Sequence, residues 1–151
     1  MIRATAINFS KPNLDIVTLY RGRSGEIAID DKRTAQLQFA SREASELEVT
    51  RQAIIALLSE WRIRRLALRV GADRGAYLLN PLAYKLEAAL QLTPRLRLDC
   101  FTVAEVAGFG RRHSDDLPEP QTHCVGSVGR SSQLNAIRTA GLSMFLAEGL
   151  A

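Results

Sequence analysis

The sequence predicts an α/β domain built on a mixed five-stranded sheet that is flanked by helices. Residues 4–39 read as strands joined by tight turns, because apolar and polar side chains alternate there between turn-forming residues. From residue 45 onward, stretches of helical periodicity alternate with short apolar strands. Strands that alternate with helices are joined by right-handed crossovers and lie parallel. The sheet therefore combines an antiparallel meander with parallel strands.

The antiparallel part is a meander of three strands. The first strand is predicted over residues 4–9 and the second over residues 14–20, with a Lys-Pro-Asn turn between them. The third strand is predicted over residues 26–39. Its middle, Asp30 to Lys32, is too polar for a regular half-buried strand.

Two of the helices begin at recognisable capping residues. Ser45 and Glu48 have the S-x-x-E spacing of a capping box, which predicts a helix over residues 46–61. Asn80 is a good N-cap and precedes Pro81, the residue type favoured at a first helical position. A second helix therefore starts there.

Two short apolar stretches, residues 65–70 and 96–101, predict the parallel strands. Thr102 is placed to cap a short helix that runs through Val106. Residues 108–129 contain Gly, Pro, Ser and Asp without periodicity, and we predict a mobile loop over this range. The whole of residues 1–151 is expected to form one domain.

The last predicted helix is apolar around much of its circumference. It begins at Ser131 or Ser132, and its apolar residues recur at helical spacing: Leu134, Ile137, Leu142, Met144, Phe145 and Leu146. A helix with so wide an apolar surface either lies under two layers of structure or packs against a second subunit. The second alternative motivates a homodimer formed through this helix.

The composition is that of an ordinary globular domain, with 46% hydrophobic and 24% charged residues. The two cysteines, the lack of an apolar run long enough to span a bilayer, and the polar start predict a cytoplasmic protein with no membrane contact. The net charge of +4 allows a polyanionic partner, because a basic surface attracts phosphates. His113, Asp115, Asp116, His123 and Cys124 lack the spacing of a metal site, so we expect a solvated polar segment and no bound metal.

Three stretches carry a resemblance to a known family. Leu66-Ala-Leu-Arg-Val-Gly-Ala-Asp-Arg-Gly-Ala-Tyr resembles the fourth strand and glycine-containing loop of RuvC-type resolvases, which belong to the RNase H-like superfamily. Leu82-Ala-Tyr-Lys-Leu-Glu-Ala-Ala-Leu-Gln-Leu is similar to their following helix, and Cys100-Phe-Thr-Val-Ala-Glu-Val is similar to their fifth strand and next helix start. A nearer likeness is to a small bacterial family of unknown function with the same architecture.

The resemblance implies a nuclease fold without its metal ligands. Active members hold two metal ions with carboxylates from the first strand, the end of the fourth strand and the last helix. These positions fall on Asn8, Val70 and Thr139, none of which is a carboxylate. We therefore expect a catalytically silent module, without a cofactor, that acts in binding or scaffolding. The alternative is a phosphodiesterase with a displaced metal site on Asp15 and Asp73.

Nucleic acid is the partner that the resemblance suggests, and arginines are the residues expected to contact it. Arg64, Arg65 and Arg69 cluster around one predicted strand and are the candidates, with an inward orientation toward a buried partner as the alternative for Arg69. Contacts from arginine to phosphate carry no sequence information, so binding of this kind is expected to be weak and sequence-independent. A structural homodimer with no nucleic-acid partner stands as the remaining alternative.

Overall fold

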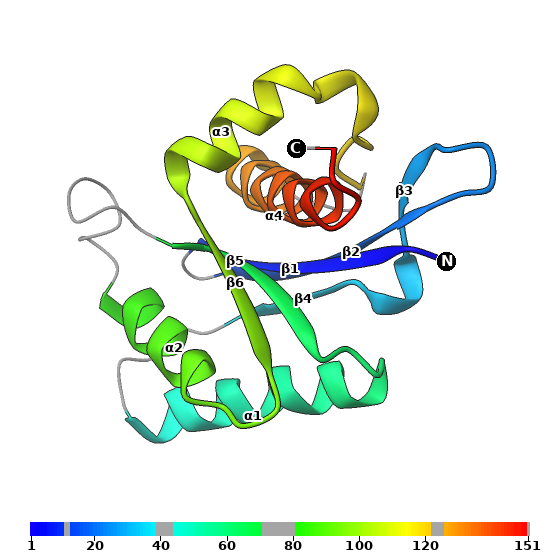
Figure 1. Cartoon of the computed structure of the whole chain (residues 1–151). Coiled ribbons are helices and arrows are strands. Elements are labelled where there is room, and N and C mark those ends of the chain that lie inside the picture. Colours follow the sequence, from blue (N-terminus) through cyan, green and yellow to red (C-terminus); the bar gives the residue numbers. More distant parts are fainter. Residues whose placement is uncertain (11–12, 39–43, 71–80, 122–125, 151) are drawn as a thin grey trace.

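The computed structural model describes residues 1–10, 13–38, 44–70, 81–121 and 126–150 of the 151-residue chain (Figure 1). The strands are β1 (Arg3–Ser10), β2 (Asn13–Arg21), β3 (Ile27–Ile29), β4 (Ala35–Gln38), β5 (Arg65–Val70) and β6 (Arg97–Thr102). The helices are α1 (Ala44–Glu60), α2 (Pro81–Gln91), α3 (Val103–Arg112) and α4 (Gly126–Ala147), with single 3₁₀ turns η1 (Asp31–Arg33) and η3 (Ser114–Asp116).

The strands form one mixed sheet in the order β3-β2-β1-β5-β6, and β4 also pairs with β2. Strand β1 is antiparallel to β2 and parallel to β5, which is parallel to β6. The predicted third strand is divided by η1, so β3 and β4 pair with successive parts of β2. Asp30 caps this turn by accepting a hydrogen bond from the Lys32 amide at 3.2 Å. The predicted mixed α/β sheet is confirmed, with its third strand in two pieces.

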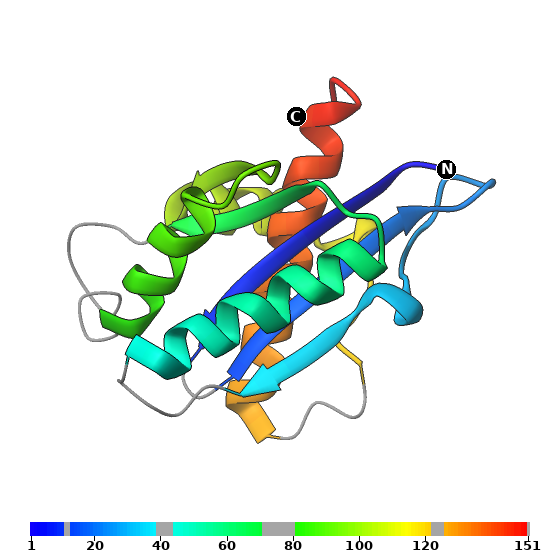
Figure 2. The same cartoon turned by 90° about the horizontal axis from the view of Figure 1, so that it is seen from below.

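Helices cover both faces of the sheet (Figures 1 and 2). Helices α1 and α2 lie on one face, and α3 and α4 lie on the other. Successive residues of a strand point to opposite faces, so Ile7 joins the core beneath α1 and α2, whereas Ala6 joins the core beneath α4. The sheet thus separates two hydrophobic cores.

Helices enter the predicted loop over residues 108–129 from both of its ends. Helix α3 continues past Val106 to Arg112, and α4 starts at Gly126 rather than at Ser131 or Ser132. Phe109 is fully buried in the core shared with α4. Burial against a neighbouring helix stabilises a sequence that has little periodicity of its own. Only the boundaries are corrected here, because residues 122–125 lie outside the described part.

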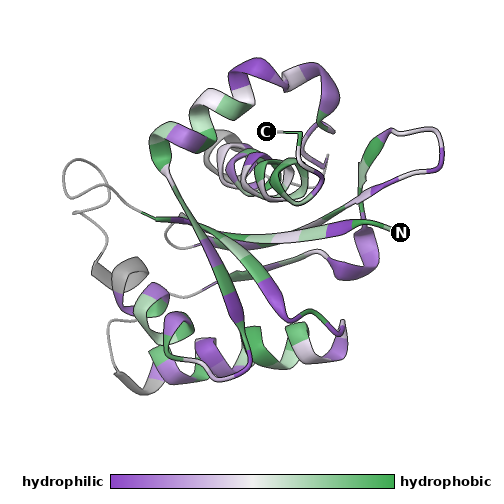
Figure 3. Ribbon diagram, in the orientation of Figure 1, coloured by the Kyte–Doolittle hydropathy of each residue, from purple (hydrophilic) through white to green (hydrophobic). Residues whose placement is uncertain are grey.

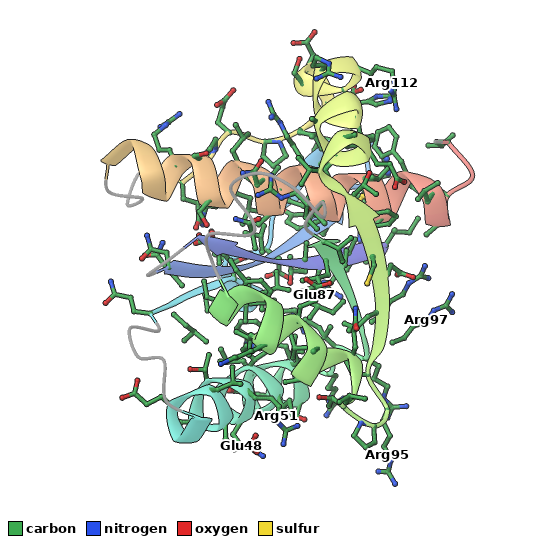
Figure 4. The ribbon with its side chains drawn as sticks, turned by 90° about the vertical axis from the view of Figure 1, so that its left-hand side faces the viewer. Glu48, Arg51, Glu87, Arg95, Arg97 and Arg112 are labelled. Atoms are coloured by element: carbon green, nitrogen blue, oxygen red, sulfur yellow. The ribbon has the colours of Figure 1, made fainter. Side chains whose placement is uncertain are left out.

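The two capping boxes behave differently. Thr102 caps α3 as predicted: its Oγ1 accepts from the Glu105 amide at 3.1 Å, and the Glu105 carboxylate accepts from the Thr102 amide at 3.2 Å. Helix α1, however, already contains Ser45. The Glu48 carboxylate accepts hydrogen bonds from Arg51 on the next turn, at 2.7 and 2.9 Å (Figure 4). The prediction of Ser45 as the N-cap is therefore wrong, because the helix starts before it.

The apolar surface of α4 is used within the chain. Its last turns are largely hydrophobic (Figure 3), and Leu142, Met144 and Phe145 are buried in the core between the sheet and α3. Leu146 alone among these four remains exposed, at 45%. Burial under two layers therefore explains the pattern that motivated a homodimer, and dimerisation stays a prediction.

Candidate functional site

Polar residues line up across the sheet at the carboxyl end of β1. Asn8 on β1 lies directly opposite Asp15 on β2, and Asp15 lies opposite Gln36 on β4. Residues directly opposite in antiparallel strands point to the same face. Ala6, two residues before Asn8, packs beneath α4, so all three side chains lie on the α4 face.

Arg69 on β5 extends this line beyond β1. The parallel register pairs Ala6 with Ala67 and Ile7 with Leu68, which brings Arg69 beside Asn8. Its neighbour on the adjacent strand β6 is Phe101, which packs in the core on the α4 side. Arg69 therefore faces α4 as well. We call Gln36, Asp15, Asn8 and Arg69 the polar row.

The centre of the polar row is buried and hydrogen-bonded. Asn8 is 3% exposed and Asp15 is 1% exposed. The Asn8 Nδ2 donates to the Oγ of Ser132 on α4 at 3.2 Å, and the Gln36 Nε2 donates to Asp15 Oδ1 at 3.2 Å. Buried polar groups need such partners, because an unsatisfied group costs about 1–3 kcal/mol.

A polar cavity of about 720 Å³ adjoins one end of the row. Asp15 and Gln36 form one side of it, and Gln121 and Gln133 form another. Gln133 accepts from the Gln121 amide at 2.5 Å and donates to its side-chain oxygen at 3.1 Å. Carboxamides offer both donors and acceptors, so the cavity can hydrogen-bond a polar ligand.

The three positions expected to hold catalytic carboxylates do not converge. Val70 packs in the core on the α1 and α2 side, so it points away from Asn8. Thr139 is fully buried and donates to the Asn135 carbonyl of its own helix at 2.7 Å. It lies about 10 Å along α4 from Ser132, since an α-helix rises 1.5 Å per residue.

Arg69 and Ser132 are the residues that β5 and α4 contribute beside Asn8. For Arg69 the sequence allows a phosphate contact or an inward orientation toward a buried partner, and strand alternation places it on the same face as Ala67. Ser132 had been expected only as a helix start. No local signal predicts its contact with a residue 124 positions earlier.

The residue types of the polar row do not suit a pair of divalent ions. Such ions prefer several carboxylate oxygens, whereas the row offers one carboxylate, two carboxamides and a guanidinium. Across the described ranges, no group of three or more His, Cys, Asp or Glu side chains is arranged to hold a metal. Asp73, the second acid of the displaced site, lies outside these ranges.

The predicted arginine cluster is divided between the two ends of β5. Arg65 pairs with Asp99 at the start of the strand, and Arg64 is exposed beside it. Arg69 is four residues further on, about 13 Å away at 3.3 Å per residue, and faces α4. These three arginines do not form one surface.

His113 has a packing role. Its ring lies 4.7 Å from the ring centroids of both Phe109 and Phe145, and its Nδ1 is 3.1 Å from Asp116 Oδ2. These contacts join the end of α3 to α4. His123 and Cys124, the other residues weighed as metal ligands, lie outside the described residues.

Solved structures match this architecture over almost the whole chain. Thermus thermophilus RuvC superposes with a TM-score of 0.63 at 11% identity, covering 99% of this chain and 98% of that chain. The chain has the fold of RuvC-type resolvases. T. thermophilus RuvC in complex with a Holliday junction substrate gives 0.64 at 11% identity, covering 100% and 98%. The fowlpox virus Holliday junction resolvase gives 0.53 at 7% identity, covering 97% and 99%.

Sequence comparisons add no family to this result. No protein-family model matches the chain, and no curated protein is significantly similar to it in sequence. None of the helices in the described part combines the length and hydropathy that crossing a membrane requires. In this RuvC-type fold, the polar row lies where β1 and β5 end beneath α4.

Proposed function

We propose that this chain is a catalytically silent RNase H-like module that binds nucleic acid without cleaving it. The observation that carries the proposal is the polar row. Asn8, Arg69 and Ser132 stand where β1, β5 and α4 meet, which is where the resemblance expects metal-binding carboxylates. Catalysis in that family depends on two metal ions that stabilise the attacking and leaving oxygens.

Arg69 strengthens the argument against metal binding. Its guanidinium stays positively charged at all ordinary pH values. A fixed positive charge on the same face as Asn8 and Asp15 repels a divalent cation. It also balances the charge of Asp15, the row's only carboxylate.

Two features support nucleic acid as the partner. Resolvases of this fold have been solved with Holliday junction DNA, both from T. thermophilus and from fowlpox virus. The net charge of +4 favours a polyanion. Among the described residues, Arg69 and Arg130 contribute cations at the edge that carries the polar row. Arg130 lies two residues before Ser132 on α4 and pairs with the exposed Glu119 at 3.9 Å. We assign the phosphate contacts to this edge.

Cleavage assays test the catalytic part of the proposal. Branched, duplex and single-stranded DNA are incubated with the protein in Mg²⁺ or Mn²⁺, with a RuvC resolvase as the positive control. We expect no cleavage by this chain. Robust cleavage that disappears in Asp15→Asn or Asp73→Asn would establish the displaced metal site and overturn the proposal.

Binding assays test the nucleic-acid part. Weak binding at ~50 mM salt is expected to fall steeply as salt rises, because each neutralised phosphate contributes about −0.9 to the slope of log affinity against log salt. Arg130→Ala is expected to flatten that slope by about one unit. Absence of retention at ~50 mM salt would exclude nucleic-acid binding and leave the scaffolding role.

A further inference from the structure

A second groove, of about 820 Å³, lies at the end of the molecule opposite to the polar row. It is bounded by the last turns of α1, by the turn before β5 and by the turn between α2 and β6. These turns precede the parallel strands, whereas Asn8 and Arg69 lie at the carboxyl ends of β1 and β5. The groove is therefore separate from the proposed nucleic-acid edge.

Part of the lining of this groove, which we call its floor, is apolar. Ile55 and Leu58 contribute from α1, and Ile63 and Leu96 contribute from the two turns. Leu58 is 3% exposed, and the other three are half-buried. An apolar side chain of a partner can therefore be buried here at a gain of about 25 cal/mol per Å² of apolar surface.

The rim of the groove is positively charged. Arg62, Arg64 and Arg95 line it, and all three are exposed. Figure 4 shows Arg95 in the turn before β6, with its side chain pointing away from the body of the protein. Within the described residues, none of the three forms an ion pair. The nearby Asp99 is already paired with Arg65 and Arg97.

Two of these arginines occupy backbone positions that favour glycine. Arg62 has φ 59° and Arg95 has φ 66°. Arg62 terminates α1 in a Schellman arrangement: the Ile63 amide donates to the Leu58 carbonyl at 2.8 Å, and the Arg62 amide donates to the Ser59 carbonyl at 3.1 Å. Non-glycine residues are uncommon at positive φ, and such strain concentrates at functional positions. Here a positive φ occurs at two arginines on the rim of the same groove.

We propose that this surface, the arginine groove, binds an acidic peptide segment of a protein partner. An apolar side chain of the peptide lies on the floor, and its carboxylates contact Arg62, Arg64 and Arg95. Nucleic acid fits the groove less well, because its lining contains no aromatic side chain on which a base could stack and its floor would desolvate a phosphate. Carboxylates match the planar guanidinium fork directly.

The probe for this proposal is a short fluorescein-labelled peptide of consecutive aspartates that ends in leucine and phenylalanine. We expect saturable binding by fluorescence anisotropy at ~50 mM salt. The double variant Arg62→Gly, Arg95→Gly is expected to weaken it on the order of tenfold, because two charge-assisted contacts are lost. Its thermal stability is expected to be preserved, since glycine suits both backbone positions.

The matched control removes the same charge elsewhere. Arg111→Ala with Arg112→Ala changes two exposed arginines at the end of α3 and is expected to leave peptide binding unchanged. If this control weakens peptide binding equally, the loss of affinity is due to the change in net charge alone, and the proposal is overturned. Equal binding of a peptide with asparagines in place of the aspartates would also overturn it, as would no binding of the acidic probe.

Duplex DNA serves as the competitor. The proposal predicts that DNA does not displace the peptide and that Arg62→Gly, Arg95→Gly leaves DNA retention unchanged. Displacement together with loss of DNA retention in that variant would make the groove a phosphate site and overturn the peptide assignment. The direct peptide-binding assay, without the competitor, contains no nucleic acid, so its result is independent of the proposed DNA binding.

Discussion

Asn8 on β1 donates a hydrogen bond from its Nδ2 to the Oγ of Ser132 on α4, at 3.2 Å. Both residues are buried, at 3% and 1% exposure. The contact joins the first strand to the last helix across 124 residues of sequence. It also shows how the chain satisfies a position where the resemblance expects a carboxylate: a neutral amide bonds to a hydroxyl.

A carboxylate introduced at this position should destabilise the fold. Asn8→Asp places a buried acid directly opposite Asp15, and we expect a loss of about 1–3 kcal/mol in the free energy of unfolding at pH 7. Burial and the charge of Asp15 raise the pKa of the introduced group, and we expect them to outweigh the opposite effect of the Arg69 guanidinium beside it. The loss is therefore full above that raised pKa, shrinks as the pH falls through it, and vanishes below about 3.9, the pKa of an unfolded Asp.

Urea unfolding at several pH values measures this effect. Asn13→Asp, at the half-buried start of β2, is the matched control and should change stability little. A pH-independent loss in Asn8→Asp would contradict the electrostatic explanation.

Two helical glycines should respond in opposite ways to alanine. An added Cβ at Gly141 would lie 2.7 Å from Leu117 Cδ2 and 3.0 Å from Cε1 of the fully buried Phe109. We expect Gly141→Ala to cost about 1–3 kcal/mol, because it forces α3 and α4 apart. At Gly110 the three atoms nearest to the added Cβ would all belong to the flexible Arg138 side chain. Gly110→Ala should be neutral or slightly stabilising in thermal unfolding, since alanine favours helix.

The ion pair between Arg21 and Glu148 should stabilise the end of α4. Arg21 donates from Nε and Nη2 to the two carboxylate oxygens, each at 2.8 Å, and both side chains are partly buried. Glu148→Gln should lower the free energy of unfolding by about 1 kcal/mol. Glu48→Gln, which breaks the exposed pair with Arg51, should have little effect at neutral pH. Equal losses of unfolding free energy in Glu148→Gln and Glu48→Gln would show that burial does not make the Arg21–Glu148 pair stronger than the Glu48–Arg51 pair.

Glu48 should contribute a small acid-sensitive component of stability. Hydrogen bonds from Arg51 and then Gln52 lower the pKa of Glu48 to about 2. A lowered pKa stabilises the fold above the unfolded value near 4.3, and this contribution disappears as the pH falls through about 2. The stability difference between the protein and Glu48→Gln should therefore narrow over that interval. A constant difference would contradict the assignment.

Replacing Arg62 by glycine should stabilise the protein. Arg62 has φ 59° at the end of α1, where glycine is preferred because it has no Cβ. We expect Arg62→Gly to raise the free energy of unfolding by up to about 1 kcal/mol, measured as a shift of the urea midpoint. Arg64→Gly provides the comparison, because Arg64 has an ordinary backbone conformation and should gain nothing.

Local patterns were sufficient for much of the fold. The alternation and apolar content of residues 65–70 predicted β5 with its observed bounds, and the polar Asp30 to Lys32 marked the place where η1 divides the third strand. Thr102 was recognised as a cap because capping depends on contacts three residues apart. The length of α3 was missed, since its stability depends on the burial of Phe109 against α4.

The candidate site was decided by tertiary structure. Strand alternation in the sequence predicts that residues of β5 point to two faces in turn, and local motifs predict a fold similar to RuvC-type resolvases. Leu66 and Ala67 are both apolar, however, so they do not reveal which face meets α4. Packing assigns Leu66, Leu68 and Val70 to the α1 and α2 side, and thereby brings Arg69 rather than Val70 beside Asn8. The axial position of α4 on the sheet then selects Ser132 rather than Thr139. Both choices depend on contacts between segments far apart in sequence, which no local pattern encodes.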